Sequence, residues 1–243
     1  MKKVVITGVS TGIGYSSAKI LCNSGYIVYG SVRKSEDVER IADKLGENFH
    51  PLIFDVTDSK AISESIEKVR SDLKPGECIA ALVNNAGIAL GGPVSLIDIE
   101  IFRKQFEVNF FGLINVTKAY LPLLGANKGS HNQGKIINIS SISGKRSYPF
   151  IAPYTASKFA VEAFSDSLRR ELMMYGVDVI LIEPGPIKTA IWDKTPDPEN
   201  NEFLGSDYEK ALGRFYKLFI EMGKKGLDAD IIGNRIKSIL QDP

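Results

Sequence analysis

Histidine and cysteine are scarce in this chain of 243 residues, which holds two of each. Cys22 and Cys78 form no CxxC pair, and His50 and His131 are far apart in the sequence. This spacing excludes the usual cysteine and histidine metal sites and a paired redox thiol. It is typical of buried or half-buried cysteines in a reducing compartment.

The chain also lacks an excess of either charge and any long apolar run. Lys and Arg total 30 against 29 for Asp and Glu, so the net charge is +1 and favours neither nucleic acid nor an anionic membrane as partner. In the opening MKKVVITGVS, glycine and polar residues interrupt the apolar run too early for a signal peptide. No segment approaches the roughly 20 apolar residues of a membrane span. We therefore expect a soluble cytoplasmic protein.

Short β-branched runs alternate with amphipathic segments of helical length. The predicted strands are 3–7, 26–32, 50–54, 79–83, 135–140 and 177–182. They are continuously apolar, which indicates strands that helices cover on both faces. The predicted helices include 12–24, 35–45, 58–73, 98–124 and 154–175. This order predicts an α/β fold with a Rossmann-type, doubly wound parallel sheet, and the absence of a repeat or linker predicts one domain over 1–243.

Of all parts of the chain, the segment 184–225 is the least typical of a strand or of a helix that covers the sheet. Its first third is rich in Pro, Asn and Asp and predicts a long loop, and aromatic and leucine side chains then recur at helical spacing. Two interpretations remain open. The part from about 186 to 225 is either a lid over a substrate site or a surface insertion that packs on its own aromatic side chains.

The glycine-rich stretch TGVSTGIG, residues 7–14, separates the first strand from the first helix. Glycine allows a backbone to turn sharply and to approach a pyrophosphate closely, and the helix N-terminus that follows attracts phosphate. The spacing is G-x3-G-x-G rather than the commoner G-x-G-x-x-G. We expect a dinucleotide phosphate site formed by Gly8, Ser10, Thr11, Gly12, Ile13 and Gly14.

The second strand ends in YGSVRKS, with a valine where an acidic residue would accept hydrogen bonds from the adenosine ribose. Arg33 and Lys34 follow, and a guanidinium can bind a 2′-phosphate bidentately. This favours NADP over NAD, although a solvated basic loop tip is the simpler interpretation. Asp55, beside Val56, is placed to meet the adenine edge, or it caps the next helix.

The stretch YTASK places Tyr154 and Lys158 one helical turn apart. A nearby ammonium favours phenolate and so lowers the tyrosine pKa from its usual value of about 10. Upstream, NISSISG puts Ser140 and Ser141 near the carboxyl edge of the sheet, where ligands bind in open α/β folds. A hydroxyl there could hold a substrate carbonyl while Tyr154 donates a proton. Taken alone, a Tyr-x3-Lys pair is common on helix surfaces.

Six motifs occur in order between residue 3 and about 190: TGVSTGIG, NNAG, VNFFG, NISS, YTASK and EPGPIKT. This ordered set resembles the short-chain dehydrogenase/reductase family in its short single-domain branch. The resemblance implies that Tyr154 is the general acid/base and that Lys158 lowers its pKa and binds the nicotinamide ribose. It selects Ser141 rather than Ser140 as the catalytic serine, and it assigns Asn109 to hold a water next to the lysine.

The resemblance also implies cofactor contacts in two further stretches. These contacts are Asn85, Ala86 and Gly87 of NNAG, and Pro184, Gly185, Ile187 and Thr189 at the nicotinamide end. Two features depart from the family pattern. No basic residue precedes the second glycine of the turn, so the NADP preference depends on Arg33. A seventh strand usually follows the helix that corresponds to 227–240, and this chain, ending in SILQDP, has none.

The resulting hypothesis is an NADP-dependent oxidoreductase that interconverts a carbonyl and an alcohol. The expected substrate is a hydrophobic ketone or aldehyde, including steroid- or retinoid-like molecules, that contacts Ser141, Ser143, Tyr148, Tyr154 and Trp192. A homodimer or homotetramer through the helices 98–124 and 154–175 is expected. The alternative is a non-catalytic dinucleotide-binding regulator on the same fold, which would be expected to have lost the tyrosine or the lysine.

Overall fold

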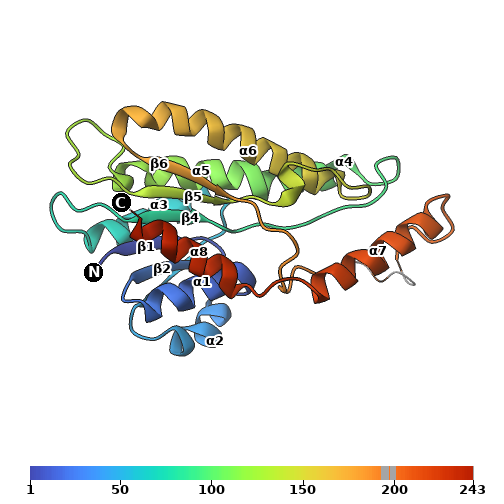
Figure 1. The fold of residues 1–243 in the computed structure, drawn as a ribbon, viewed down its shortest axis with the longest axis horizontal. Helices are drawn as coiled ribbons and strands as arrows, with labels where there is room; N and C mark the ends of the chain where they lie inside the picture. Colours follow the sequence, from blue (N-terminus) through green and yellow to red (C-terminus); the bar gives the residue numbers. More distant parts are fainter. Residues whose placement is uncertain (193–196, 198–200, 243) are drawn as a thin grey trace.

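Six parallel strands form the central sheet, in the order β3-β2-β1-β4-β5-β6. The computed structural model describes residues 1–192, 197 and 201–242 (Figure 1). The strands are β1 Lys3–Ile6, β2 Ile27–Val32, β3 Phe49–Ile53, β4 Ala81–Asn84, β5 Lys135–Ile139 and β6 Asp178–Ile182. Every predicted run matches its strand to within two residues at each end, and the doubly wound parallel sheet is confirmed. The strand order reverses between β1 and β4, at the switch point where such sheets bind ligands.

Helices cover both faces of this sheet (Figure 1). One face carries α1 Gly12–Asn23, α2 Ser35–Leu45 and α8 Asp230–Gln241, and the other carries α3 Ser59–Ser71, α5 Gly112–Tyr120 and α6 Ala152–Leu172. Both faces of the sheet are therefore apolar, as the continuous apolar runs predict. No helix within the described residues is both long enough and apolar enough to cross a membrane.

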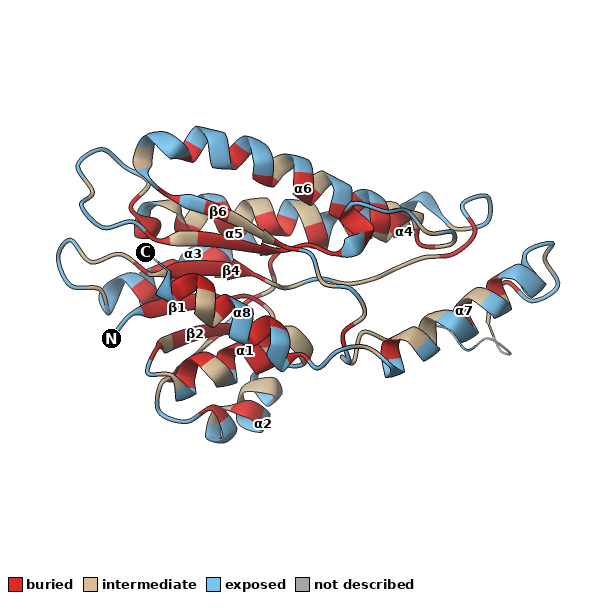
Figure 2. Cartoon of the chain, in the orientation of Figure 1, coloured by how far each residue is buried: buried red, intermediate tan, exposed pale blue. Residues whose placement is uncertain are grey.

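Successive strand residues point into two separate cores, because side chains alternate between the two faces of a strand. Val4 and Ile6 of β1 belong to the core beneath α1 and α8. Val5, between them, belongs to the core beneath α3 and α5, together with Tyr120. All four side chains are fully buried, and Figure 2 shows the strands as the most buried layer of the molecule.

The predicted long helix over 98–124 is interrupted. It consists of α4 Ile99–Phe106, a π-helical turn Glu107–Phe111, α5, and a 3-10 turn Leu121–Leu124. A π-helical turn widens the helix by one residue and is frequent at functional sites. It contains Asn109, so the irregularity falls on a predicted site residue.

One of the two alternatives for Asp55 is wrong. The N-terminus of α3 is capped by Asp58, whose side chain accepts hydrogen bonds from the backbone N–H groups of Lys60 and Ala61. Asp55 instead accepts from the backbone N–H of Thr57 at 2.9 Å. It is three residues further from the helix, too far to reach the unpaired N–H groups of the first turn.

The segment after β6 leads into α7 Glu209–Lys224, which projects from the carboxyl edge of the sheet (Figure 1). Its aromatic side chains recur at helical spacing, as predicted, and Leu212 and Tyr216 are buried with Phe203. Phe150, from the loop before α6, packs against this cluster. Residues 193–196 and 198–200, which belong to the expected lid, lie outside the described residues.

The structure predicts that two isoleucines of the sheet contribute very differently to the free energy of unfolding. Ile137 of β5 is fully buried, whereas Ile53 at the edge of the sheet is 55% exposed. Ile137→Ala should lower the free energy of unfolding by about 2–5 kcal/mol, because it leaves a cavity in the core. Ile53→Ala should change it by about 1 kcal/mol or less. Urea unfolding of both variants measures this difference, and equal losses would contradict the assigned core.

Candidate active site

The glycine-rich turn lies at the carboxyl end of β1, at the switch point of the sheet. Gly8 has φ 73° and Gly12 has φ 59°, in the left-handed region that favours glycine. A Cβ atom on Gly14 would overlap the carbonyl oxygen of Gly8. The backbone is therefore folded too tightly here for side chains, as the sequence predicts.

The turn fits a bound pyrophosphate. The N-cap of α1, Thr11, makes no side-chain hydrogen bond to the first turn of the helix. The first backbone N–H groups of α1 thus have no capping partner from Thr11, and the helix dipole favours an anion beside them. Thr189 borders the same space, since its Cγ2 would lie 3.0 Å from a Cβ on Gly12.

Thr7 and Asn85 join the glycine-rich turn to the NNAG turn. The backbone N–H groups of Asn85 and Ala86 each donate to Oγ1 of Thr7 at 3.0 Å. Nδ2 of Asn85 donates to the carbonyl oxygens of Thr7 at 2.9 Å and Gly8 at 3.0 Å. The predicted cofactor residues at the ends of β1 and β4 therefore form one rigid unit. Sequence reasoning missed Thr7, although its position at the end of the first strand was the available signal.

The predicted adenosine end lies at neighbouring strands. Arg33 and Lys34 follow β2 and are exposed, and Asp55 and Val56 follow β3, which pairs with β2. Sequence reasoning also missed Arg40 of α2, whose Nη2 donates to the carbonyl oxygen of Ser10 at 2.9 Å. This bond ties α2 to the glycine-rich turn.

The catalytic candidates come from β5, the turn after it, and α6. Pro153 occupies the first turn of α6, where its missing N–H is no loss, and Tyr154 follows it. The side chain of Ser141, from the turn after β5, lies close enough to the phenol of Tyr154 to act on its pKa. Nζ of Lys158 donates to the carbonyl oxygen of Ile139 at 2.8 Å and lies 5.8 Å from the centroid of the Tyr154 ring. The tertiary structure thus brings together the three residues that the sequence selects.

Desolvation is the main cause of the pKa shifts of Tyr154 and Lys158. It raises the pKa of the Tyr154 phenol, and the hydrogen bond to Ser141 opposes that rise. It lowers the pKa of Lys158 to about 8, and the charge of Glu162 opposes that fall. The sequence predicts a lowered tyrosine pKa, but in this structure desolvation of the phenolate raises it. Tyr154 is therefore protonated at neutral pH, the state of a proton donor.

Asn109 joins the π-helical turn to the segment after NNAG. It is buried, and its amide donates to the carbonyl oxygen of Ile88 at 3.0 Å and accepts from the N–H of Ile88 at 2.8 Å. Its Nδ2 also lies 3.3 Å from Oγ of Ser157 on α6. Gln105, which sequence reasoning missed, holds the same segment through the N–H of Leu90 at 2.7 Å. These two buried amides hold the backbone of the segment from Ile88 to Leu90 in place.

Other residues predicted to bind cofactor or substrate lie in the segment after β6 and in the loop between β5 and α6. The carbonyl oxygen of Pro184 accepts from the N–H of Ile142 at 3.0 Å, which ties the predicted nicotinamide segment to the turn after Ser141. Ser143 is buried in that turn, and Tyr148 lies beneath the guanidinium of Arg146.

Trp192 packs against α7. Its indole N–H donates to the carbonyl oxygen of Ile187 at 2.6 Å, and its ring centroid lies 4.7 Å from that of Phe219 on α7. The indole therefore fastens α7 to the segment that contains Ile187. Contacts of Ser143, Tyr148 and Trp192 with a substrate stay predictions.

Comparison with known proteins agrees with this geometry. The family model described as short chain dehydrogenase matches residues 2–200. The chain is 43% identical over 236 residues to the NADPH-dependent 3-dehydrocapnine reductase of Ornithobacterium rhinotracheale, covering 97% of this chain and 82% of that protein. It is 34% identical over 240 residues to the 3-ketodihydrosphingosine reductase of Bacteroides thetaiotaomicron, covering 98% and 82%. A short-chain dehydrogenase from Streptomyces avermitilis superposes with a TM-score of 0.79 at 26% identity, covering 99% and 84%.

These relatives are dehydrogenases and reductases, and their similarity extends over nearly the whole chain. The enzyme class predicted from the sequence is therefore confirmed: the protein is an oxidoreductase of carbonyl and hydroxyl groups that uses a nicotinamide cofactor. On the ordered motifs, the parallel sheet and these comparisons, the chain belongs to the short-chain dehydrogenase/reductase family.

Proposed function

We propose that this enzyme uses NADPH to reduce a ketone on a long aliphatic chain, with Tyr154 as the proton donor. The observation on which the proposal depends is the position of Tyr154 on α6, one helical turn before the buried Lys158, whose Nζ lies 5.8 Å from the centroid of the Tyr154 ring. Desolvation raises the pKa of the Tyr154 phenol and so keeps it protonated. A group that must deliver a proton to a carbonyl oxygen has to be protonated before the reaction and has to lie beside a binding hydroxyl.

The side chains divide the work of reduction as follows. The hydroxyl of Ser141 and the phenol of Tyr154 both bind the substrate carbonyl oxygen, and Tyr154 transfers its proton as negative charge develops there. The Lys158 ammonium stabilises the tyrosinate that remains. NADPH, when bound along the glycine-rich and NNAG turns, supplies the hydride. Asn109 and Gln105 position the backbone at Ile88 beside these groups.

Three observations support NADP over NAD. The side chains of Arg33 and Lys34 are exposed directly after β2, where they can meet a 2′-phosphate. The residue before them is a valine rather than an acid that would repel this phosphate. The relative from Ornithobacterium rhinotracheale is named as NADPH-dependent.

Apolar residues of the lid support a long-chain substrate. Phe203, Leu212 and Tyr216 pack with Phe150, whose ring centroid lies 5.6 Å from that of Phe215. Phe150 stands in the loop between Ser141 and Tyr154, so the cluster borders the catalytic turn. The names of two relatives describe reductases of a 3-dehydro and a 3-keto compound. We assign the lid at about 186–225 to the same single domain as the sheet.

The same proposal includes self-association in the cytoplasm. Phe111 and Phe159, on the helices predicted to pair copies of the chain, are 48% and 43% exposed. Large exposed apolar side chains on neighbouring helices are typical of protein interfaces. We therefore expect a homodimer or homotetramer through residues 98–124 and 154–175.

Tyr154→Phe tests the proton donor. The variant keeps the ring and removes only the hydroxyl, so carbonyl reduction should fall by about 10²-fold or more while NADPH affinity stays within about twofold. Absorbance at the nicotinamide band follows turnover, and fluorescence titration follows NADPH binding. Tyr175→Phe, in the turn after the far end of α6, is the matched control and should retain turnover. Full activity of Tyr154→Phe would remove Tyr154 as the acid.

Arg33→Asp tests the cofactor preference. Replacing the cation by an anion should lower kcat/KM with NADPH relative to NADH by about tenfold or more, equivalent to about 1.4 kcal/mol. Arg170→Asp makes the same charge change at an exposed position on α6 and should leave the ratio unchanged. An unchanged ratio in Arg33→Asp would show that another group selects the cofactor.

The substrate class can be tested with a series of ketones. We expect kcat/KM to rise with alkyl length from short aliphatic ketones to 3-ketodihydrosphingosine, because each buried methylene contributes about 0.8 kcal/mol. Steroidal and retinoid carbonyls provide the comparison. A preference for a rigid ring system, or rates that do not depend on chain length, would contradict an aliphatic substrate.

A further inference from the structure

Glu162 is a buried carboxylate one helical turn beyond Lys158 on α6. It is 6% exposed, although an ionised carboxylate is rarely buried unless a cation lies close to it. Its side chain fits beside Gly144, where a Cβ atom would lie 2.9 Å from Cγ of Glu162 and 2.9 Å from Oγ of Ser140. The glycine of NISSISG therefore leaves room for this carboxylate behind the catalytic serine.

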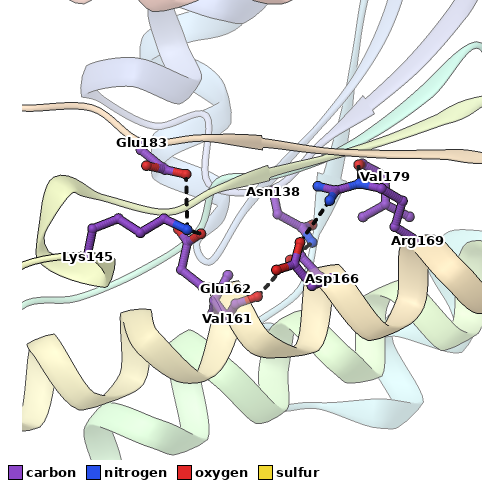
Figure 3. A network of polar contacts seen from close by, with 9 residues as sticks. Asn138, Lys145, Val161, Glu162, Asp166, Arg169, Val179 and Glu183 are labelled. Atoms are coloured by element: carbon purple, nitrogen blue, oxygen red, sulfur yellow. Dashed lines mark hydrogen bonds and ion pairs between the residues drawn. The ribbon is translucent and has the colours of Figure 1, made fainter.

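Lys145 neutralises one side of this carboxylate. Its Nζ lies 2.8 Å from Oε2 of Glu162 and 3.7 Å from Oε1 of Glu183. Figure 3 shows the ammonium of Lys145 between the two carboxylates, with Glu162 reaching up from α6 and Glu183 coming from the segment after β6. The side chain of Lys145 is 54% exposed, so solvent screens this pair.

Lys158 lies one helical turn before Glu162 on the same face of α6, and both side chains are buried. The groups that act on Lys158 are Tyr154 and Glu162 from α6 and the carbonyl oxygen of Ile139 from β5. Lys145 and Glu183 lie beyond Glu162. The carbonyl oxygen orients the ammonium but carries no net charge. Burial lowers the pKa of Lys158 to about 8, and Glu162 acts against this fall.

We propose that Glu162 is a positioning residue that acts through Lys158, keeping the buried ammonium charged and thereby keeping the Tyr154–Lys158 pair competent for proton transfer. The proposal depends on the function proposed above for Tyr154. Glu162 does not touch the reacting atoms. It supplies the interior negative charge without which burial would neutralise Lys158 near physiological pH.

The direction of the expected pH effect follows from the charges. Lys158 loses its proton as the pH rises through its pKa, and reduction should decline there because the tyrosinate loses its stabilising cation. The anion of Glu162 places this decline at higher pH than burial alone would. Removing that anion should therefore move the alkaline limb of the pH profile to lower pH.

The central experiment compares Glu162→Gln with Asp166→Asn. Both changes remove one carboxylate from α6, but Asp166 is half-exposed and pairs with Arg169. The measurement is kcat/KM for NADPH-dependent reduction of the fastest ketone of the series between pH 6 and pH 10. Glu162→Gln should move the alkaline limb down by roughly one pH unit, and Asp166→Asn should leave it in place. An unmoved limb in a folded Glu162→Gln variant overturns the proposal.

Lys145→Gln serves as a second test, made on the half-exposed side of the site where Lys145 pairs with Glu162. Lys145 opposes Glu162 electrostatically, so its removal should move the alkaline limb in the opposite direction, to higher pH. The shift should be the smaller one because this side chain is half-exposed. A limb that stays in place or moves to lower pH overturns the proposal even if Glu162→Gln fails to fold.

The two proposals fail in different ways. Full activity of Tyr154→Phe would refute the proposed proton donor, whatever Glu162 does. An inactive Tyr154→Phe together with an unmoved alkaline limb in Glu162→Gln would refute only the role of Glu162. If no ketone is reduced, the pH dependence of NADPH affinity in Glu162→Gln is measured instead, and an unshifted profile overturns the proposal.

Discussion

The parallel pairing of β1 with β4 is the constraint on which the rest of the site depends. It brings the carboxyl ends of two strands that are distant in the sequence into register, with Ile6 beside Val83. Thr7 then receives the N–H groups of Asn85 and Ala86. Because the strand order reverses at this pair, the crossover helices lie on opposite faces and leave the edge between them open to a ligand. The glycine-rich turn can fold as tightly as it does only because Asn85 satisfies its carbonyl groups.

Desolvation also determines the pKa values of the candidate proton-transfer groups, and nearby polar groups act against it. Tyr154 and Lys158 sit where both lose water, so each shifts toward its neutral form. Glu162 acts on Lys158 in the opposite direction. Figure 3 shows the outer part of this network, in which Lys145 lies between the carboxylates of Glu162 and Glu183. The candidate pair of Tyr154 and Lys158 therefore lies next to a group of charged side chains from α6 and from the segments after β5 and β6.

The features that follow from local chemistry could be predicted from the sequence. Continuous apolar runs indicate buried parallel strands, and glycines with room for no side chain indicate the phosphate turn. The features that depend on the packing of distant segments could not be predicted from the sequence. Nothing in the letters of 98–124 indicates a π-helical turn at Asn109, because that turn reflects the fit of the helix against Ile88 and α6. Asp55 and Asp58 are both aspartates and could each cap a helix. The residue at which α3 begins, Ser59, makes Asp58 the cap.

The order of elements and the family follow from the sequence alone, as does the choice of Ser141, Tyr154 and Lys158 as candidates, because motifs and their spacing are local properties of the chain. Only the tertiary structure decided how those side chains behave. The pKa of Tyr154 is raised rather than lowered because the phenol is buried, and burial is a sum over segments that are distant in sequence. The same holds for Glu162. Its spacing of four residues from Lys158 can be read from the sequence. Its burial beside Gly144 and its pairing with Lys145 arise only when the turn after β5 packs on α6.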